Sequence, residues 1–196
     1  MGKGCEAEGL AGRTFAFGFF DQVAGQLAGR LKIRSARHLA RPLAALLVGG
    51  MAKSGVLDDL QGKRVAIVPV PTAKSRKRER GIDHTRLVAK ELARIMGWGL
   101  CEVLERKNEG MQRGRTKAER LKQAKGLFAL KSGKKWAFDT VKSEHDTVNA
   151  AGDTVFDTVI LYDDITTTGA TLAECVKALE KSGVKDVRCV VLAKTR

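Results

Sequence analysis

Two kinds of hydrophobic pattern alternate along the chain. Apolar residues recur every three or four positions over residues 21–51, which predicts two helices with Pro42 near a boundary or kink, and again over 87–95 and 172–179. Short apolar runs rich in β-branched residues predict strands at 64–71, 100–104, 127–130, 159–162 and 187–192. The helix over 87–95 should end at Gly97, and the last helix should span about 170–181. Strands that alternate with helices favour a parallel, doubly wound α/β sheet.

Three polar stretches interrupt this pattern. Residues 72–81 read as a basic loop, and residues 105–125 are typical of a mobile flap. Residues 136–158 repeat the triplet Asp-Thr-Val at 139, 146 and 153, and a further Asp-Thr follows at 157. Copies this short fall below a repeat architecture, so we expect a surface hairpin or a disordered insertion.

The charge distribution narrows the choice of ligands. The chain has 196 residues, 43% of them hydrophobic, which is enough for one domain with a buried core. Its net charge is +14, and residues 61–135 alone hold 21 basic and 7 acidic side chains. A positive charge confined to the middle third suits an anion-binding face, although a solvated surface would show the same composition.

The cysteines and the hydrophobic runs exclude other classes. Cys5, Cys101, Cys175 and Cys189 form no C-x-x-C pair, which argues against a structural zinc site and favours reduced core thiols. No run approaches the roughly 18 apolar residues of a membrane span, and residues 15–20 lack the length of a signal peptide. We therefore expect a cytoplasmic protein.

The most informative segment runs from 159 to 171. An apolar strand leads into Asp163 and Asp164, then into a turn with three threonines and Gly169, and then into a helix. A helix start with free backbone N–H groups, small residues and threonine hydroxyls suits a phosphate dianion. The two carboxylates would then face the group attached to that phosphate, such as a sugar with vicinal hydroxyls.

Two other interpretations compete with this phosphate site. A strand that ends in two acids also resembles a Walker B segment, but no G-x-x-x-x-G-K-[ST] precedes it in this chain. A helix capped by threonine, with acids near its positive end, would need no ligand at all.

The segment resembles the 5-phosphoribosyl-1-pyrophosphate (PRPP) motif of type I phosphoribosyltransferases. Further residues are similar to the ComF family: Val68-Pro-Val-Pro71, the basic run after it, Arg80-Gly81, and Arg106, Gln112, Arg120 and Phe128 at the family's spacing. The chain also departs from that family. It lacks a four-cysteine zinc ribbon, Gln123 replaces a usual Asn, and Ile82-Asp83-His84 stands where an aromatic-Asn-Gln triplet is usual.

The resemblance implies an α/β fold with a type I phosphoribosyltransferase-like parallel sheet flanked by helices and a flexible flap, or hood. We expect an N-terminal helical segment over residues 1–55 and the phosphoribosyltransferase-like domain over 56–196, with an insertion at 131–157. The resemblance further implies Mg²⁺-dependent transfer of a phosphoribosyl group from PRPP to an unidentified nitrogen acceptor. A nucleoside monophosphate would occupy the same site.

By the same resemblance, Asp163 and Asp164 bind the ribose hydroxyls as catalytic residues and help to place Mg²⁺, directly or through water. The 5-phosphate falls to Thr166, Thr167, Thr168, Gly169, Ala170 and Thr171. Candidates for the pyrophosphate and the flap are Thr72, Lys74, Arg76, Arg80, Arg106, Gln112 and Arg120. His84 is expected to be a surface or capping residue rather than a base.

A binding protein on the same scaffold is the alternative to an enzyme. The ComF resemblance links such proteins to competence and DNA uptake, where the basic middle third would contact single-stranded DNA or a helicase partner. A homodimer is a further partner expectation. An aromatic content of 5% argues modestly against a base-stacking platform but not against phosphate contacts.

Overall fold

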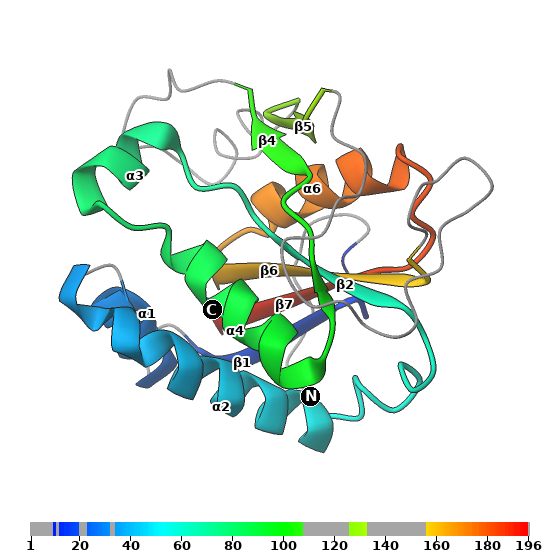
Figure 1. Ribbon diagram of the computed structural model, residues 1–196, viewed down its shortest axis with the longest axis horizontal. Coiled ribbons are helices and arrows are strands. Elements are labelled where there is room, and N and C mark those ends of the chain that lie inside the picture. Colours follow the sequence, from blue (N-terminus) through cyan, green and yellow to red (C-terminus); the bar gives the residue numbers. More distant parts are fainter. Residues whose placement is uncertain are drawn as a thin grey trace.

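A five-stranded parallel sheet forms the centre of the protein (Figure 1). The computed structural model describes residue 10 and residues 12–19, 23–31, 34–107, 126–132 and 156–195. The strand order is β1-β7-β6-β2-β3, and each neighbouring pair runs parallel. The strands are β1 (Thr14–Phe19), β2 (Val65–Pro69), β3 (Gly99–Leu100), β6 (Thr158–Thr166) and β7 (Val187–Lys194). The predicted parallel α/β fold is confirmed.

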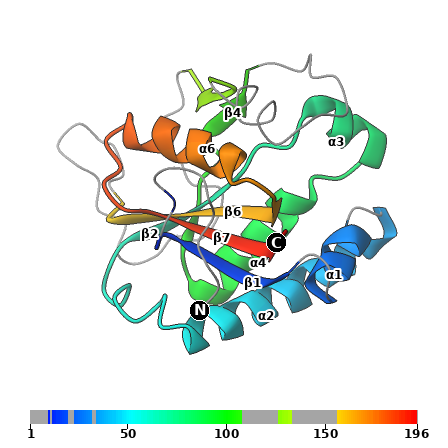
Figure 2. The same cartoon turned by 180° about the vertical axis from the view of Figure 1, so that it is seen from behind.

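Helices cover both faces of this sheet. The described helices are α1 (Val23–Leu31), the 3₁₀ helix η1 (Arg34–Leu39), α2 (Ala40–Lys53), α3 (Lys74–Arg80), α4 (His84–Met96) and α6 (Ala170–Glu180). Helix α6 lies on one face, and α1, α2 and α4 lie on the other (Figures 1 and 2). Helix α4 has clear local signals: Asp83 caps its start, and Gly97 ends it in the left-handed conformation at φ 67°.

Strand alternation divides the core into two layers. On β6, Val159 and Leu161 pack in the cluster shared with α6, whereas Ile160 and Tyr162 pack in the cluster shared with α2 and α4. All four side chains are almost completely buried, as expected for a parallel strand covered on both faces. The same alternation applies to Asp163 and Asp164, which follow on β6.

A second, smaller sheet lies on the α6 side. Strands β4 (Leu104–Arg106) and β5 (Phe128–Leu130) pair antiparallel, and Leu104 and Phe128 join the α6 core cluster. The sequence predicted one strand over 100–104; the chain instead ends β3 at Leu100 and begins β4 at Leu104. Most of the predicted flap, residues 108–125, and the Asp-Thr-Val triplets at 139, 146 and 153 lie outside the described residues, whereas Asp157 and Thr158 lead into β6.

Two elements differ from the prediction. The basic run predicted as a loop contains helix α3, and Gly81 at φ 65° ends it. Strand β1 was not predicted at all, although it pairs with β7 over its length. The division of the chain near residue 55 stays a prediction, but β1 shows that the first region also supplies a strand to the sheet. None of the helices seen here is long and apolar enough to cross a membrane.

Charged side chains hold together the amino ends of the central strands. Arg64, before β2, binds Asp157, before β6, through its backbone N–H at 2.8 Å and its guanidinium at 3.0 Å. Arg188 on β7 contacts both oxygens of Asp59 at 2.6 Å and also Asp186 at 3.0 Å. Because the charges satisfy one another, this end of the sheet is a structural junction.

Candidate functional site

The carboxyl ends of β2 and β6 form the topological switch point of the sheet. From β2 the chain continues through α3 and α4 to β3 on one side, and from β6 it continues through α6 to β7 on the other. Ligands of open α/β sheets bind outside the carboxyl ends of strands at such a point. The backbone N–H of Val70 donates to the carbonyl of Tyr162 at 2.9 Å, so the two chains stay paired up to this edge.

The turn between β6 and α6 has the features that a phosphate site needs. Thr166 and Thr168 are buried, Thr167 is exposed, and Gly169 takes a φ of 75° immediately before the helix. Thr168 Oγ1 accepts a hydrogen bond from the Ala170 N–H at 3.3 Å. Helix α6 contains 11 residues, and the backbone N–H groups of its first turn have no intrahelical partner and point back toward this turn.

Asp163 and Asp164 leave β6 toward opposite faces of the sheet. Asp164 has the same parity as Tyr162, which packs on the α2 and α4 side, and Asp163 has the parity of Leu161 on the α6 side. Both carboxylates are fixed by the backbone: Asp163 Oδ1 accepts from the Asp164 N–H at 2.8 Å, and Asp164 Oδ1 accepts from the Ile165 N–H at 3.0 Å.

The two carboxylates affect the pKa values of buried groups on both faces of the sheet. Burial raises the pKa of Tyr162 well above its ordinary value, and the charges of Asp164 and then Asp163 raise it further. Burial also raises the pKa of the Cys175 thiol on α6, with Asp163 the next cause, while Arg106 acts in the opposite direction. The negative charge at the end of β6 therefore acts on buried groups in both core layers. On the α6 side, the positive charge of Arg106 acts against it.

His84 is a site residue that sequence reasoning missed. Its Nε2 lies 2.9 Å from Asp164 Oδ2, and its side chain is 3% exposed. The expectation of a surface or capping position is wrong, because the first turn of α4 packs against the end of β6. A partner 80 positions away leaves no local pattern by which this contact could be predicted.

Asp83, next to His84, connects α4 with the chain that follows β2. Its Oδ1 accepts from Thr72 Oγ1 at 3.0 Å and from the Arg86 N–H at 3.3 Å. Its Oδ2 lies 2.5 Å from Lys77 Nζ on α3. One carboxylate thus fixes the β2–α3 connection, α3 and the start of α4.

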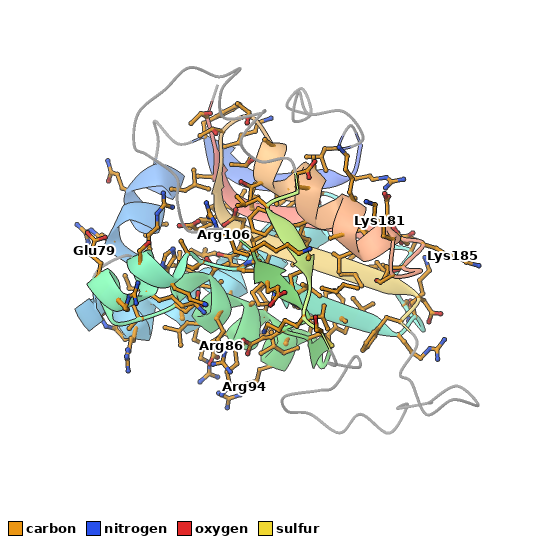
Figure 3. All side chains as sticks on the ribbon, turned by 90° about the horizontal axis from the view of Figure 1, so that it is seen from above. Glu79, Arg86, Arg94, Arg106, Lys181 and Lys185 are labelled. Atoms are coloured by element: carbon orange, nitrogen blue, oxygen red, sulfur yellow. The ribbon has the colours of Figure 1, made fainter. Side chains whose placement is uncertain are left out.

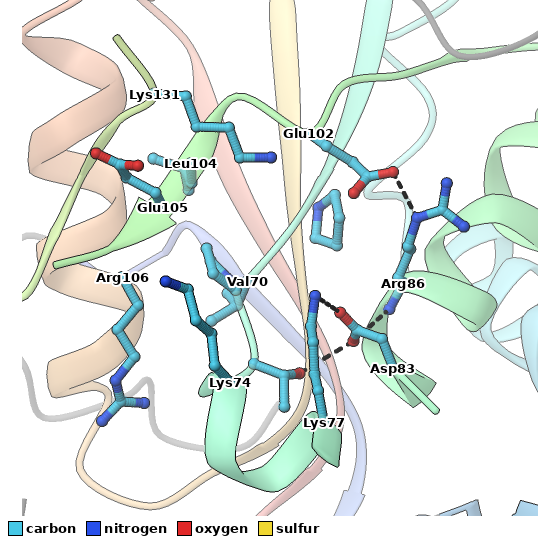
Figure 4. A pocket seen from close by; sticks show the side chains of 13 residues that line it. Val70, Lys74, Lys77, Asp83, Arg86, Glu102, Leu104, Glu105, Arg106 and Lys131 are labelled. Carbon is cyan, nitrogen blue, oxygen red and sulfur yellow. Dashed lines mark hydrogen bonds and ion pairs between the residues drawn. The ribbon is translucent and has the colours of Figure 1, made fainter. Parts of the chain in front are cut away.

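A cavity of about 170 Å³ opens between this junction and the small sheet (Figure 4). Lys74 approaches it from α3, and Lys131 extends over it from the end of β5 (Figure 4). Five basic and three acidic side chains line it, so positive charge prevails. The charged lining residues are Lys74, Lys77, Asp83, Arg86, Glu102, Glu105, Arg106 and Lys131.

The predicted pyrophosphate residues fall into three groups. Thr72, Lys74 and Arg106 line the cavity, whereas Arg76 is exposed on α3 and does not. Arg106 lies toward the middle of the molecule, whereas Glu79 and Lys185 project from its periphery (Figure 3). The side chain of Arg80 and both Gln112 and Arg120 lie outside the described part of the chain. Arg86 and Lys131 also line the cavity and were not predicted, because the cavity could not be inferred from sequence.

The chain is similar to one curated protein over most of its length. Competence protein F of Haemophilus influenzae is 28% identical over 170 residues, which covers 86% of this chain. The chain spans 66%, just under two thirds, of the length of that relative. The predicted ComF-like resemblance is therefore confirmed.

Two solved structures are distantly similar. A hypoxanthine phosphoribosyltransferase from Staphylococcus aureus has 14% identity and a TM-score of 0.35, covering 81% of this chain and 63% of its own. An orotate phosphoribosyltransferase from Aeropyrum pernix has 18% identity and a TM-score of 0.31, covering 76% of each chain.

The family comparison covers the part of the chain that carries the β6–α6 turn. The model of the phosphoribosyl transferase domain matches residues 82–196, more than half of the chain, from the residue before Asp83 to the last strand. This protein belongs to the phosphoribosyl transferase domain family.

Proposed function

We propose that this protein binds PRPP at the β6–α6 turn and transfers its phosphoribosyl group to a nitrogen acceptor in a Mg²⁺-dependent reaction. The observation that carries the proposal is the juxtaposition, at the β2–β6 switch point, of a helix start, two carboxylates and a cavity with excess positive charge. Each part matches one part of PRPP: the 5-phosphate, the ribose hydroxyls and the pyrophosphate.

The 5-phosphate is assigned to the turn from Thr166 to Thr171. Backbone N–H groups at the start of α6 donate to the phosphate oxygens, and the positive end of the helix dipole favours the dianion. The positive φ of Gly169 lets the backbone approach without a side chain in the way. A nucleoside monophosphate would be held in the same manner.

The ribose is assigned to Asp163 and Asp164, whose carboxylates accept hydrogen bonds from its hydroxyls. The carboxylate oxygens are also the ligand type that Mg²⁺ prefers. Within the described ranges, no group of three or more His, Cys, Asp or Glu could hold a metal ion by itself. This donor set fits Mg²⁺, which commonly takes one or two carboxylates together with substrate phosphates, and which supplies charge neutralisation on the pyrophosphate when bound.

The cavity is assigned to the pyrophosphate and the acceptor. As the bond from ribose C1 to the pyrophosphate oxygen breaks, the acceptor nitrogen bonds to C1 and releases its proton to solvent. Positive charge develops on the sugar, where the carboxylates of Asp163 and Asp164 stabilise it. Negative charge develops on the leaving group, where Lys74 and Arg106 stabilise it.

A pyrophosphate-release screen tests this proposal. The protein is incubated with PRPP and Mg²⁺ and a panel of purines, pyrimidines and amines; we expect release with one class and loss of release in Asp163→Asn and Asp164→Asn. Asp58→Asn is the matched control, because Asp58 is exposed in the connection before β2, at the other end of the sheet. No calorimetric binding of PRPP, together with no effect of the two site variants, would overturn the proposal.

A role in competence is a second proposal, supported by the name of the relative from Haemophilus influenzae. Arg76 and Arg78 lie on the exposed side of α3. In the cytoplasm they would contact either the phosphates of single-stranded DNA or the surface of a helicase partner. Oligonucleotide affinity measured across salt concentrations should fall steeply as salt rises, and less steeply in Arg76→Gln. A flat salt response would contradict it. A homodimer stays a prediction that sedimentation can test.

A further inference from the structure

We propose that His84 is a positioning residue that fixes the carboxylate of Asp164 for the ribose hydroxyls and, through Asp83, ties that carboxylate to the β2–α3 connection. This inference rests on the proposed function, because it gives Asp164 its ribose role. It assigns to the first turn of α4 a part in the site that the sequence analysis did not.

The imidazole of His84 is buried and, within the described part of the chain, has a single hydrogen-bond contact. A carboxylate only accepts hydrogen bonds, so Nε2 of His84, 2.9 Å from Asp164 Oδ2, carries the hydrogen of this contact. The other ring nitrogen, Nδ1, is buried and has no hydrogen-bond partner among the residues placed by the structure. Burying a polar ring with one nitrogen unsatisfied costs free energy that an apolar side chain would avoid. Packing alone therefore does not account for a histidine at this position.

The carboxylate of Asp164 is held through both of its oxygens. Asp164 Oδ1 accepts from the Ile165 N–H at 3.0 Å, and Oδ2 accepts from His84 at 2.9 Å. With one donor on each oxygen, rotation of the carboxylate about its last bond is blocked. A carboxylate oxygen can accept more than one hydrogen bond, so this fixed orientation also sets the directions from which further donors approach. Such preorganisation favours a ligand with two adjacent hydroxyls over a ligand with one.

Asp83 connects His84 to the lining of the cavity. Its carboxylate contacts Thr72, Lys77 and the Arg86 N–H, all of which belong to or border the cavity. His84 follows it directly in the chain. A displacement of the β2–α3 connection when an anion enters the cavity would therefore shift the start of α4 and, with it, the donor to Asp164. The pair Asp83-His84 joins the two halves of the site.

Binding of small sugars tests the inference without catalysis. Affinities for ribose 5-phosphate, 2-deoxyribose 5-phosphate and inorganic phosphate are measured by calorimetry on the wild type, His84→Gln and His84→Phe. We expect the wild type to prefer ribose 5-phosphate over the deoxy sugar. His84→Phe should lose about tenfold in affinity for ribose 5-phosphate, the size expected for one hydrogen bond to a charged group, and keep its affinity for inorganic phosphate. His84→Gln, whose amide can donate to Asp164, should restore the preference.

The outcomes separate this inference from the proposed function. If the wild type binds none of the three ligands, the proposed function fails and the inference falls with it. If the wild type prefers ribose 5-phosphate and His84→Phe keeps the full preference, His84 has no positioning role and the proposed function stands. If thermal denaturation shows that His84→Phe is not folded, the preference for ribose 5-phosphate is compared between His84→Gln and His84→Asn instead. The shorter Asn amide should not reach Asp164, so equal preference in both variants would overturn the inference.

Discussion

The two ends of the parallel sheet differ in how far their charged residues balance one another. At the amino ends of β2, β6 and β7, Arg64 and Arg188 are matched by Asp157, Asp59 and Asp186 at hydrogen-bonding distance. At the carboxyl ends, the charges surround a cavity in which basic side chains outnumber acidic ones. Mutual pairing satisfies charge within the protein, whereas an unbalanced lining is suited to an anion from outside.

The comparison separates stability from binding. Charges that satisfy each other should contribute to folding and leave ligands unaffected. Charges arranged around the β6–α6 turn and the cavity should contribute to binding and little to folding.

The largest expected effect is on ligand binding in Asp164→Asn. Replacing the carboxylate weakens its hydrogen bonds to sugar hydroxyls, so the affinity for GMP should fall by about 10- to 100-fold. The melting temperature should change little, because the Asn oxygen can still accept from the Ile165 N–H and its amide NH₂ can donate to Nε2 of His84 in the other tautomer. A large loss of stability with unchanged affinity would break the comparison.

Arg188→Met is the matching change at the other end. The arginine connects the chain before β2 to β7 through Asp59 and Asp186. Its loss should lower the free energy of unfolding by about 1 kcal/mol, as measured by urea denaturation, because the pairs are partly exposed. Affinity for GMP should match that of the wild type. Weakened GMP binding in a folded Arg188→Met would contradict the separation of the two ends.

Lys74→Met and Lys131→Met sharpen the assignment of the cavity. Each removes one positive charge from its lining, so the affinity for pyrophosphate should fall several-fold, by roughly 1 kcal/mol or less, and the loss should shrink at high salt. Lys53→Met, at the exposed end of α2, is the control and should bind pyrophosphate like the wild type. Equal affinities in all three variants would remove the cavity from the anion site.

The smallest expected effect is the acid response of the amino ends. Arg64 lowers the pKa of Asp157 through side-chain and backbone hydrogen bonds. A carboxylate with a lowered folded pKa stabilises the protein above its unfolded pKa, about 3.9, and this contribution is lost as pH falls through the folded value. The stability difference between wild type and Arg64→Met should therefore be constant above pH ~5 and shrink below pH ~4. A difference that grows on acidification would be inconsistent with this pairing.

The sequence predicted most of the central fold because its signals are local. The apolar strands at β2, β6 and β7 and the capped helix α4 follow from periodicity and end signals. Helix α3 has no apolar periodicity in Lys-Ser-Arg-Lys-Arg-Glu-Arg, so nothing local distinguishes it from a loop. Strand β1 does alternate, with Phe15, Phe17 and Phe19 on one face, and this period of two was the signal that could have identified it.

The site was predictable only where one segment contains it. The β6–α6 turn carries its carboxylates, threonines and glycine within nine residues, so its chemistry can be read directly from the chain. The contact of His84 with Asp164 and the lining of the cavity by Lys131 join distant segments. Such contacts depend on how β2, α4 and the small sheet pack, and no spacing in the sequence records them.

A crystal structure of the protein soaked with GMP tests the central claim most directly. We predict the 5-phosphate against the N–H groups at the start of α6 and the ribose hydroxyls within hydrogen-bonding distance of Asp163 or Asp164. A fully occupied nucleotide at any other place, with the β6–α6 turn closed to it, would contradict the account.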